Sequence, residues 1–176
     1  IVVNYYTLNN IDTINQSNKG IVASEQAPTI LISPVKLADF LSTGALVMQL
    51  KSHQIQLSNQ HRWADNLSDA ITRRLLANLS KMRSDYNFEK NELHWKDNAQ
   101  RSINISFEQF TVLADRSVLT SGTFWLLDKH NKLMTKQSFE IVKPLTKDGY
   151  NHAVAQLESS LITLAEKIES SFELLK

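Results

Sequence analysis

The sequence predicts an α/β fold: a two-layer sandwich whose largely antiparallel, or else mixed, sheet is packed by two main helices, including a long C-terminal helix. Residues 103–141 contain three successive segments in which apolar and polar side chains alternate, as in strands. Residues 67–79 and 150–172 instead repeat their apolar side chains every three or four positions, as helices do. An amphipathic helix gains most of its stability by covering another apolar surface, and the sheet provides that surface.

The first third of the chain predicts four short strands with polar or proline-containing connections. These strands occupy residues 5–8, 29–32, 45–51 and 54–57. Between the first two, residues 9–27 are rich in Asn, Ser, Gln and Thr, which predicts a surface loop. Pro34 ends the second strand, and residues 37–41 suffice for one or two helical turns. Ser52 and His53 alone separate the last two strands, which predicts a tight hairpin.

The first helix is expected to follow Asp65 or Asn66, because either side chain can cap the free backbone N–H groups of a first turn. Residues 80–100 are strongly polar and predict no more than a short edge strand or hairpin.

The strongest strand pattern changes parity within its first strand. Ile103, Ile105 and Phe107 share one parity, whereas Phe110, Val112 and Ala114 share the other. A bulge near Glu108 and Gln109 is therefore expected, because it keeps both sets on the core side. Residues 117–127 and 133–141 complete a three-stranded meander around a polar turn at 128–132. After Pro144, Asp148 is the expected N-cap of the long helix.

Composition narrows the class of protein. The 176 residues favour one domain spanning 1–176, and a net charge of +1 gives no field that would attract nucleic acid. Cysteine is absent, which removes thiol catalysis, thiolate metal sites and disulfides. No segment approaches the ~20 apolar residues that a membrane-spanning helix needs.

No motif predicts catalysis, a cofactor or a metal. The five histidines are scattered, at positions 53, 61, 94, 130 and 152, without a paired spacing that would hold a metal. The four glycines lie too far apart to form a phosphate-binding loop. Ser121 and Gly122 lack the flanking pattern of a nucleophile elbow. We therefore expect a protein that binds rather than catalyses.

Large aromatic side chains near the ends of predicted elements are the candidate functional residues. They are Tyr5, Tyr6, Arg62, Trp63 and Trp125, with Arg62 included because a guanidinium stacks on aromatic rings. Each is either a contact for a partner or a structural anchor. A tryptophan directly before a helix cap commonly packs into the core, so both interpretations stay open for Trp63.

These segments also carry a family resemblance. Tyr5-Tyr6-Thr7-Leu8, the run from Ile32 through Ser33-Pro34 to Leu41, and His61-Arg62-Trp63-Ala64 before a helix occur in a characteristic order. Ser121-Gly122-x-Phe124-Trp125-Leu126-Leu127 and Asp148-Gly149-Tyr150 follow. In this order and spacing the chain resembles the ABC-type transport auxiliary lipoprotein family, typified by paraquat-inducible protein C.

The resemblance implies a lipoprotein of Gram-negative bacteria, anchored in the outer membrane by a lipidated cysteine that precedes Ile1, with its domain in the periplasm. It further implies a non-enzymatic adaptor of a lipid transport system between the two membranes, docking or capping an MCE-domain protein. It also allows self-association as a homo-oligomer. The alternative is a periplasmic carrier that holds a lipid or lipopeptide chain between the C-terminal helix and the sheet.

Overall fold

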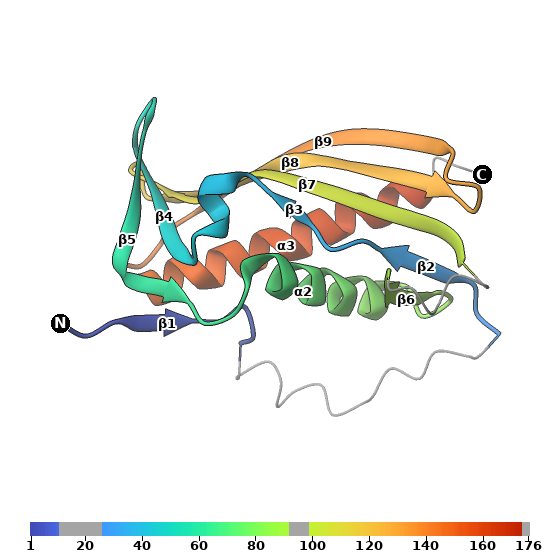
Figure 1. The fold of residues 1–176 in the computed structure, drawn as a ribbon, viewed down its shortest axis with the longest axis horizontal. Helices are drawn as coiled ribbons and strands as arrows, with labels where there is room; N and C mark the ends of the chain where they lie inside the picture. The colour runs from blue at the N-terminus through green and yellow to red at the C-terminus, as the bar shows by residue number, and fades with distance from the viewer. Residues whose placement is uncertain (11–25, 92–98, 174–176) are drawn as a thin grey trace.

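The computed structural model describes residues 1–10, 26–91 and 99–173, and it shows the predicted α/β fold of one sheet and two long helices (Figure 1). The strands are β1 (Asn4–Tyr6), β2 (Thr29–Ile32), β3 (Lys36–Leu37), β4 (Ala45–Lys51), β5 (Gln54–Trp63), β6 (Asn87–Lys90), β7 (Ala99–Leu113), β8 (Ser117–Asp128) and β9 (Leu133–Pro144). The helices are the 3₁₀ helix η1 (Asp39–Ser42), α2 (Leu67–Met82) and α3 (Tyr150–Glu173).

The sheet is mixed, and β7 is its central strand. One edge of β7 pairs in antiparallel fashion with β8, which pairs likewise with β9. The other edge of β7 pairs in parallel with β2, β3 and β4 in turn. β6 extends the sheet beyond β2, while β5 and then β1 extend it beyond β4. The long ladders are antiparallel, as predicted, and the parallel pairs join segments that are distant in sequence.

The predicted bulge lies in β7, where the register with β8 shifts between Phe107 and Gln109. The extra residue, Glu108, is exposed, while Phe107 and Phe110 on either side are almost completely buried. The bulge thus keeps the apolar side chains of both halves of β7 against the helices. Ala114 does not share their face as predicted: it lies beyond the end of the strand and is exposed.

Both helices pack on one face of the sheet and against each other, so the core has two layers (Figure 1). Asn66 caps α2, as predicted, by accepting a hydrogen bond from the backbone N–H of Asp69. Asp148 does not cap α3: the carbonyl of Gly149 accepts the first helical hydrogen bond, and the Asp148 carboxylate instead accepts from Arg116. Within this apolar interface, Thr120 of β8 and Ser160 of α3 share a buried hydrogen bond of 2.6 Å.

Two further strand boundaries differ from prediction, and one expected strand is confirmed. The first strand is Asn4–Tyr6 rather than residues 5–8, although Leu8 is buried at its end. The strand expected at 54–57 continues to Trp63. In the polar stretch 80–100, the described residues contain the expected short edge strand, β6, which pairs in parallel with β2. Most of the predicted loop 9–27, together with residues 92–98, lies outside the described residues.

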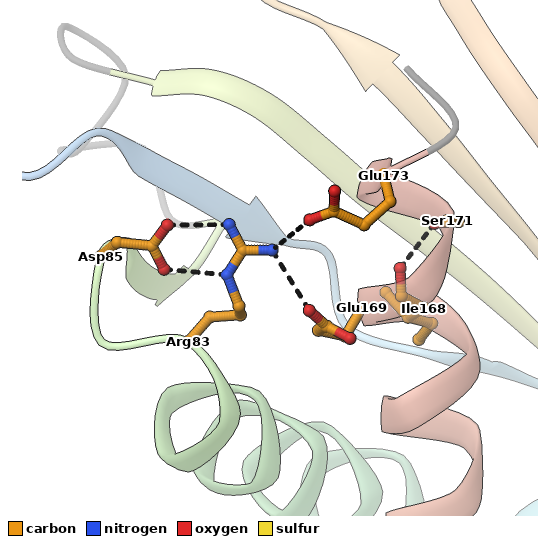
Figure 2. A network of polar contacts seen from close by, with 6 residues as sticks. All are labelled: Arg83, Asp85, Ile168, Glu169, Ser171 and Glu173. Carbon is orange, nitrogen blue, oxygen red and sulfur yellow. Dashed lines mark hydrogen bonds and ion pairs between the residues drawn. The ribbon is translucent and has the colours of Figure 1, made fainter. Parts of the chain in front are cut away.

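Arg83 ties the end of α2 to the end of α3 (Figure 2). Its guanidinium donates two hydrogen bonds to Asp85, at 2.8 and 2.7 Å, and a third to Glu169 at 3.2 Å. Glu173 lies 3.6 Å away, and the guanidinium also lies over the ring of Tyr86. The hydrogen bonds to Arg83 lower the pKa of Asp85 below its ordinary value. Charge-assisted bonds of this kind are stronger than neutral ones.

We expect Arg83→Ala to lower the free energy of unfolding by about 1–2 kcal/mol at neutral pH, because the mutation removes these charge-assisted bonds. Arg73→Ala is the matched control, since its single ion pair with Asp65 joins side chains that are 56% and 50% exposed. Such an exposed pair contributes at most about 1 kcal/mol. Urea unfolding of both variants measures the difference. If both lose the same free energy of unfolding, the additional bonds of Arg83 do not contribute to stability.

Candidate partner-binding surface

The C-terminal half of β5 is distorted by a wide bulge. Val47 of β4 pairs with Leu57, and Ala45 pairs with Arg62, so residues 58–61 of β5 stand opposite Leu46 alone. The Ser58 hydroxyl stabilises this bulge by accepting a hydrogen bond from the backbone N–H of His61 at 3.0 Å. From His61 onwards, β5 pairs in parallel with β1, and Tyr6 stands beside Trp63. Bulges commonly redirect side chains next to functional surfaces.

His61 joins three elements through an aromatic cluster. Its ring stacks on Tyr150, the first residue of α3, with centroids 3.6 Å apart and planes 12° apart. The Tyr6 hydroxyl lies 2.8 Å from His61 Nδ1, within hydrogen-bonding distance. Burial, and then the neighbouring Tyr150, raise the pKa of the Tyr6 hydroxyl. This cluster fixes β1 and the bulge of β5 against the start of α3.

Arg62 and Trp63 both contact other parts of the chain. The Arg62 guanidinium donates to the carbonyl of Thr43 at 2.9 Å and lies against Gly44, whose φ of +82° favours glycine. The indole of Trp63 is only 7% exposed and packs on Phe110, with ring centroids 5.9 Å apart. Both residues lie in a strand, not in a loop before the helix, and Trp63 is a core side chain.

Tyr5 is the most exposed of the five candidates, and Trp125 is half-buried. Tyr5 is 64% exposed on β1. Trp125 is half-buried on the face of the sheet that points away from the helices, with the Lys136 ammonium of β9 5.9 Å from its ring centroid. Tyr6 is half-buried in the cluster with His61. The five predicted residues therefore do not form one site, because β1 and the middle of β8 lie far apart in the sheet order.

Two surface hollows accompany these residues. A hollow of about 290 Å³ beside the β5 bulge is lined by the buried side chains of Leu46, Val47 and Val112 and by the polar residues of the bulge. A broader groove of about 670 Å³ lies along the outer face of the sheet. It is lined by Pro34, Lys36, Asn104, Ser106, Trp125 and Leu127.

Sequence reasoning missed His61 and Tyr150 as a pair. Their contact joins a strand to a distant helix, and neither residue belongs to a metal or catalytic motif. The stacked pair became visible only once the fold placed the end of β5 beside the start of α3.

Glu158 of α3 is a half-buried carboxylate whose pKa is raised by burial, while Arg74, 3.9 Å away, lowers it. A raised folded-state pKa means that the native state binds the proton more tightly, so stability falls as pH rises from about 4.5 through that pKa. Glutamine does not ionise. We therefore expect the free energy of unfolding of Glu158→Gln, measured relative to that of the natural protein, to be higher at pH 7 than at pH 4. Urea unfolding at both pH values measures this change. A relative loss would show that the ion pair with Arg74 outweighs burial.

Within residues 1–10, 26–91 and 99–173, no group of three His, Asp or Glu side chains is arranged to hold a metal ion. In the same ranges, no helix combines the length and hydropathy needed to cross a membrane.

The structure is that of an α/β protein, in which two helices cover one face of a mixed sheet. Several of its strands carry exposed aromatic or apolar side chains. The chain belongs to the family of ABC-type transport auxiliary lipoprotein components, whose model matches residues 6–169. The sequence resemblance is thereby confirmed, and the family is that of an accessory component of transport.

Solved structures share the fold. An uncharacterised protein matches with a TM-score of 0.81 and 22% identity, over 98% of this chain and 99% of its own. A Xanthomonas campestris protein of family DUF330 matches with a TM-score of 0.67 and 10% identity, over 84% and 86%. A PelC dodecamer from Paraburkholderia phytofirmans matches with a TM-score of 0.51 and 10% identity, over 85% and 88%. Comparison with curated proteins gives no match.

Proposed function

We propose that this protein is a non-enzymatic adaptor of an MCE-type lipid transport system between the two membranes of a Gram-negative bacterium. A lipid anchor holds it in the outer membrane, and its domain lies in the periplasm, where it docks or caps an MCE-domain protein. Membership of a transport auxiliary lipoprotein family supports this role.

The observation that carries the proposal is the distribution of exposed apolar side chains. Nine large hydrophobic residues are exposed in the described part of the chain, and six of these lie on β5 or in and before β1. They are Ile1, Val2, Val3, Tyr5, Ile55 and Leu57. Ile55 and Leu57 lie in the half of β5 that pairs with β4, whereas β1 pairs with the other end of β5. Exposed apolar groups on a strand are typical of interaction sites. We infer that the MCE-domain partner contacts β5 and its hollow.

Self-association is part of the same proposal. The PelC structure with this fold is a dodecamer. If the partner has several copies, an oligomeric adaptor binds it more tightly than a single copy does. Its equivalent surfaces contact several copies at once, and linked contacts add avidity.

Capture from bacterial envelopes tests the adaptor role. The leader-bearing protein is purified from solubilised envelopes, and mass spectrometry identifies what it retains. We expect an MCE-domain protein with the natural chain and at least about a ten-fold loss for the double variant Ile55→Asp, Leu57→Asp, because two buried contacts would become charged. Ile162→Asp is the matched control, since Ile162 is 42% exposed on α3, away from β5. Failure to recover an MCE-domain protein with the natural chain would refute the proposal.

The alternative, a lipid carrier, is favoured by one feature, the groove beside Trp125 on the outer face of the sheet. Its volume lies within the usual range of ligand sites, about 300–1,000 Å³. The position first expected lies between α3 and the sheet, where Leu161, Leu164, Ala165 and Ile168 are fully buried. Mass spectrometry of the purified protein would show a stoichiometric lipid if this alternative holds.

A further inference from the structure

β9 is a long strand with an open edge. Within the part of the chain that the structure describes, β9 pairs with β8 alone, and the ladder runs from Leu133 to Pro144 (Figure 1). The carbonyl of Pro144 accepts a hydrogen bond from Gln156 of α3, so that end is already covered. The register with β8 shifts at Met134, so residues 135–142 offer a continuous edge of unpaired backbone groups, which is a template for another strand.

The face of β9 that points away from the helices carries Lys136, Ser138, Glu140 and Val142, all exposed. The alternate residues Phe139 and Ile141 are buried against the core. Natural edge strands often carry a lysine that repels further strands. Here Lys136 and Glu140 lie on the same face, on either side of Ser138. The edge therefore attracts a strand that places a negative charge opposite Lys136 and a positive charge opposite Glu140.

The strand that satisfies this order is β9 itself. In an antiparallel pair of two β9 strands centred on Ser138, Lys136 of each copy stands opposite Glu140 of the other. Residues directly opposite each other in an antiparallel ladder lie on the same face, so both charge pairs form on the outer face. Moving the centre by one residue, to Gln137 or Phe139, removes both charge pairs.

We propose that the open edge of β9 is a two-fold interface, at which two copies of this chain join their sheets in antiparallel register about Ser138. The interface is isologous, so it closes on itself and gives a dimer or an even-numbered assembly. It rests on the self-association included in the proposed function and deepens it, because it names the surface through which two copies join. That surface is distinct from the residues on β1 and β5.

Charge reversal tests the register. In sedimentation velocity over a range of concentrations, we expect the natural chain to dimerise. Lys136→Glu and Glu140→Lys should each weaken dimerisation by at least about ten-fold, because each places like charges opposite one another twice. The double variant Lys136→Glu, Glu140→Lys should restore it. A natural chain that stays monomeric at high concentration, or single variants that associate unchanged, would overturn the proposal.

A cysteine at the two-fold axis gives an independent test, since the chain contains no cysteine of its own. Opposed Cα atoms in an antiparallel pair lie about 4.5–5.5 Å apart, within the range that a disulfide spans. Ser138→Cys should therefore give a covalent dimer under mild oxidation. Thr123→Cys is the matched control: Thr123 neighbours Ser138 on β8, so two copies would lie three strand spacings, about 14 Å, apart. No cross-link at 138, or equal cross-linking at both positions, would refute this register. Capture of the MCE-domain protein through β5 is measured separately, so one proposal can fail without the other.

Discussion

Gly122→Ala is expected to lower the free energy of unfolding by about 3 kcal/mol or more, or to prevent folding, because the sheet leaves no room for a Cβ atom there. A Cβ at position 122 would lie 1.9 Å from the carbonyl oxygen of Ser106 and 3.0 Å from the Cα of Phe107. Both atoms belong to the backbone of β7. A flexible side chain would move aside at little cost, whereas the central strand of the sheet moves only with its neighbours.

The bulge at Glu108 explains this close approach. Gly122 pairs with Phe107 directly before the register shift between Phe107 and Gln109, and a glycine within a strand commonly marks such a place. Ser121→Ala is the matched control, because Ser121 is adjacent, half-buried and on the opposite face of β8. We expect the control to stay within about 0.5 kcal/mol of the natural protein. Thermal unfolding measures both, and the Gly122 variant should melt roughly 10 °C lower. A variant with an unchanged Tm would show that β7 can shift to accept a methyl group.

The parts of the fold that sequence predicted well are those with a local period. The meander of β7, β8 and β9 and the helices α2 and α3 each have an apolar repeat of two or of about 3.6 residues. The parity change between Phe107 and Phe110 even located the bulge, since one strand can bury both only if a residue is inserted between them.

The parts that sequence could not predict depend on distant contacts. The end of β5 has no apolar alternation, and it is a strand because β1 and Gly44 satisfy its backbone hydrogen bonds. The parallel pairs of β7 with β2, β3 and β4 join segments whose order in space no local pattern records. Among the candidate site residues, sequence identified large aromatic side chains but not their exposure. The same uncertainty therefore applied to Trp63 and Trp125, although one lies in the core and the other at the surface.

Trp63→Ala is expected to lower the free energy of unfolding by about 3–5 kcal/mol, since a large buried aromatic side chain leaves a cavity when truncated. The indole is 7% exposed and packs against Phe110 in the main core. Trp63→Phe keeps part of that packing and should lose less. Trp125→Ala removes a half-buried ring from the outer face of β8, above Lys136, and should cost about 1 kcal/mol or less.

Urea unfolding of the three variants separates a structural anchor from a surface contact. If Trp63→Ala is the more destabilised variant, any loss of partner capture in it is explained by loss of the fold, and Trp63 is removed from the candidate interface. Trp125→Ala, which keeps its fold, then reports directly on the outer groove: loss of a bound lipid or partner assigns a function to that groove. The reverse order of stabilities would contradict the burial of the two rings, and would mean that the outer face of β8 is covered in the folded protein.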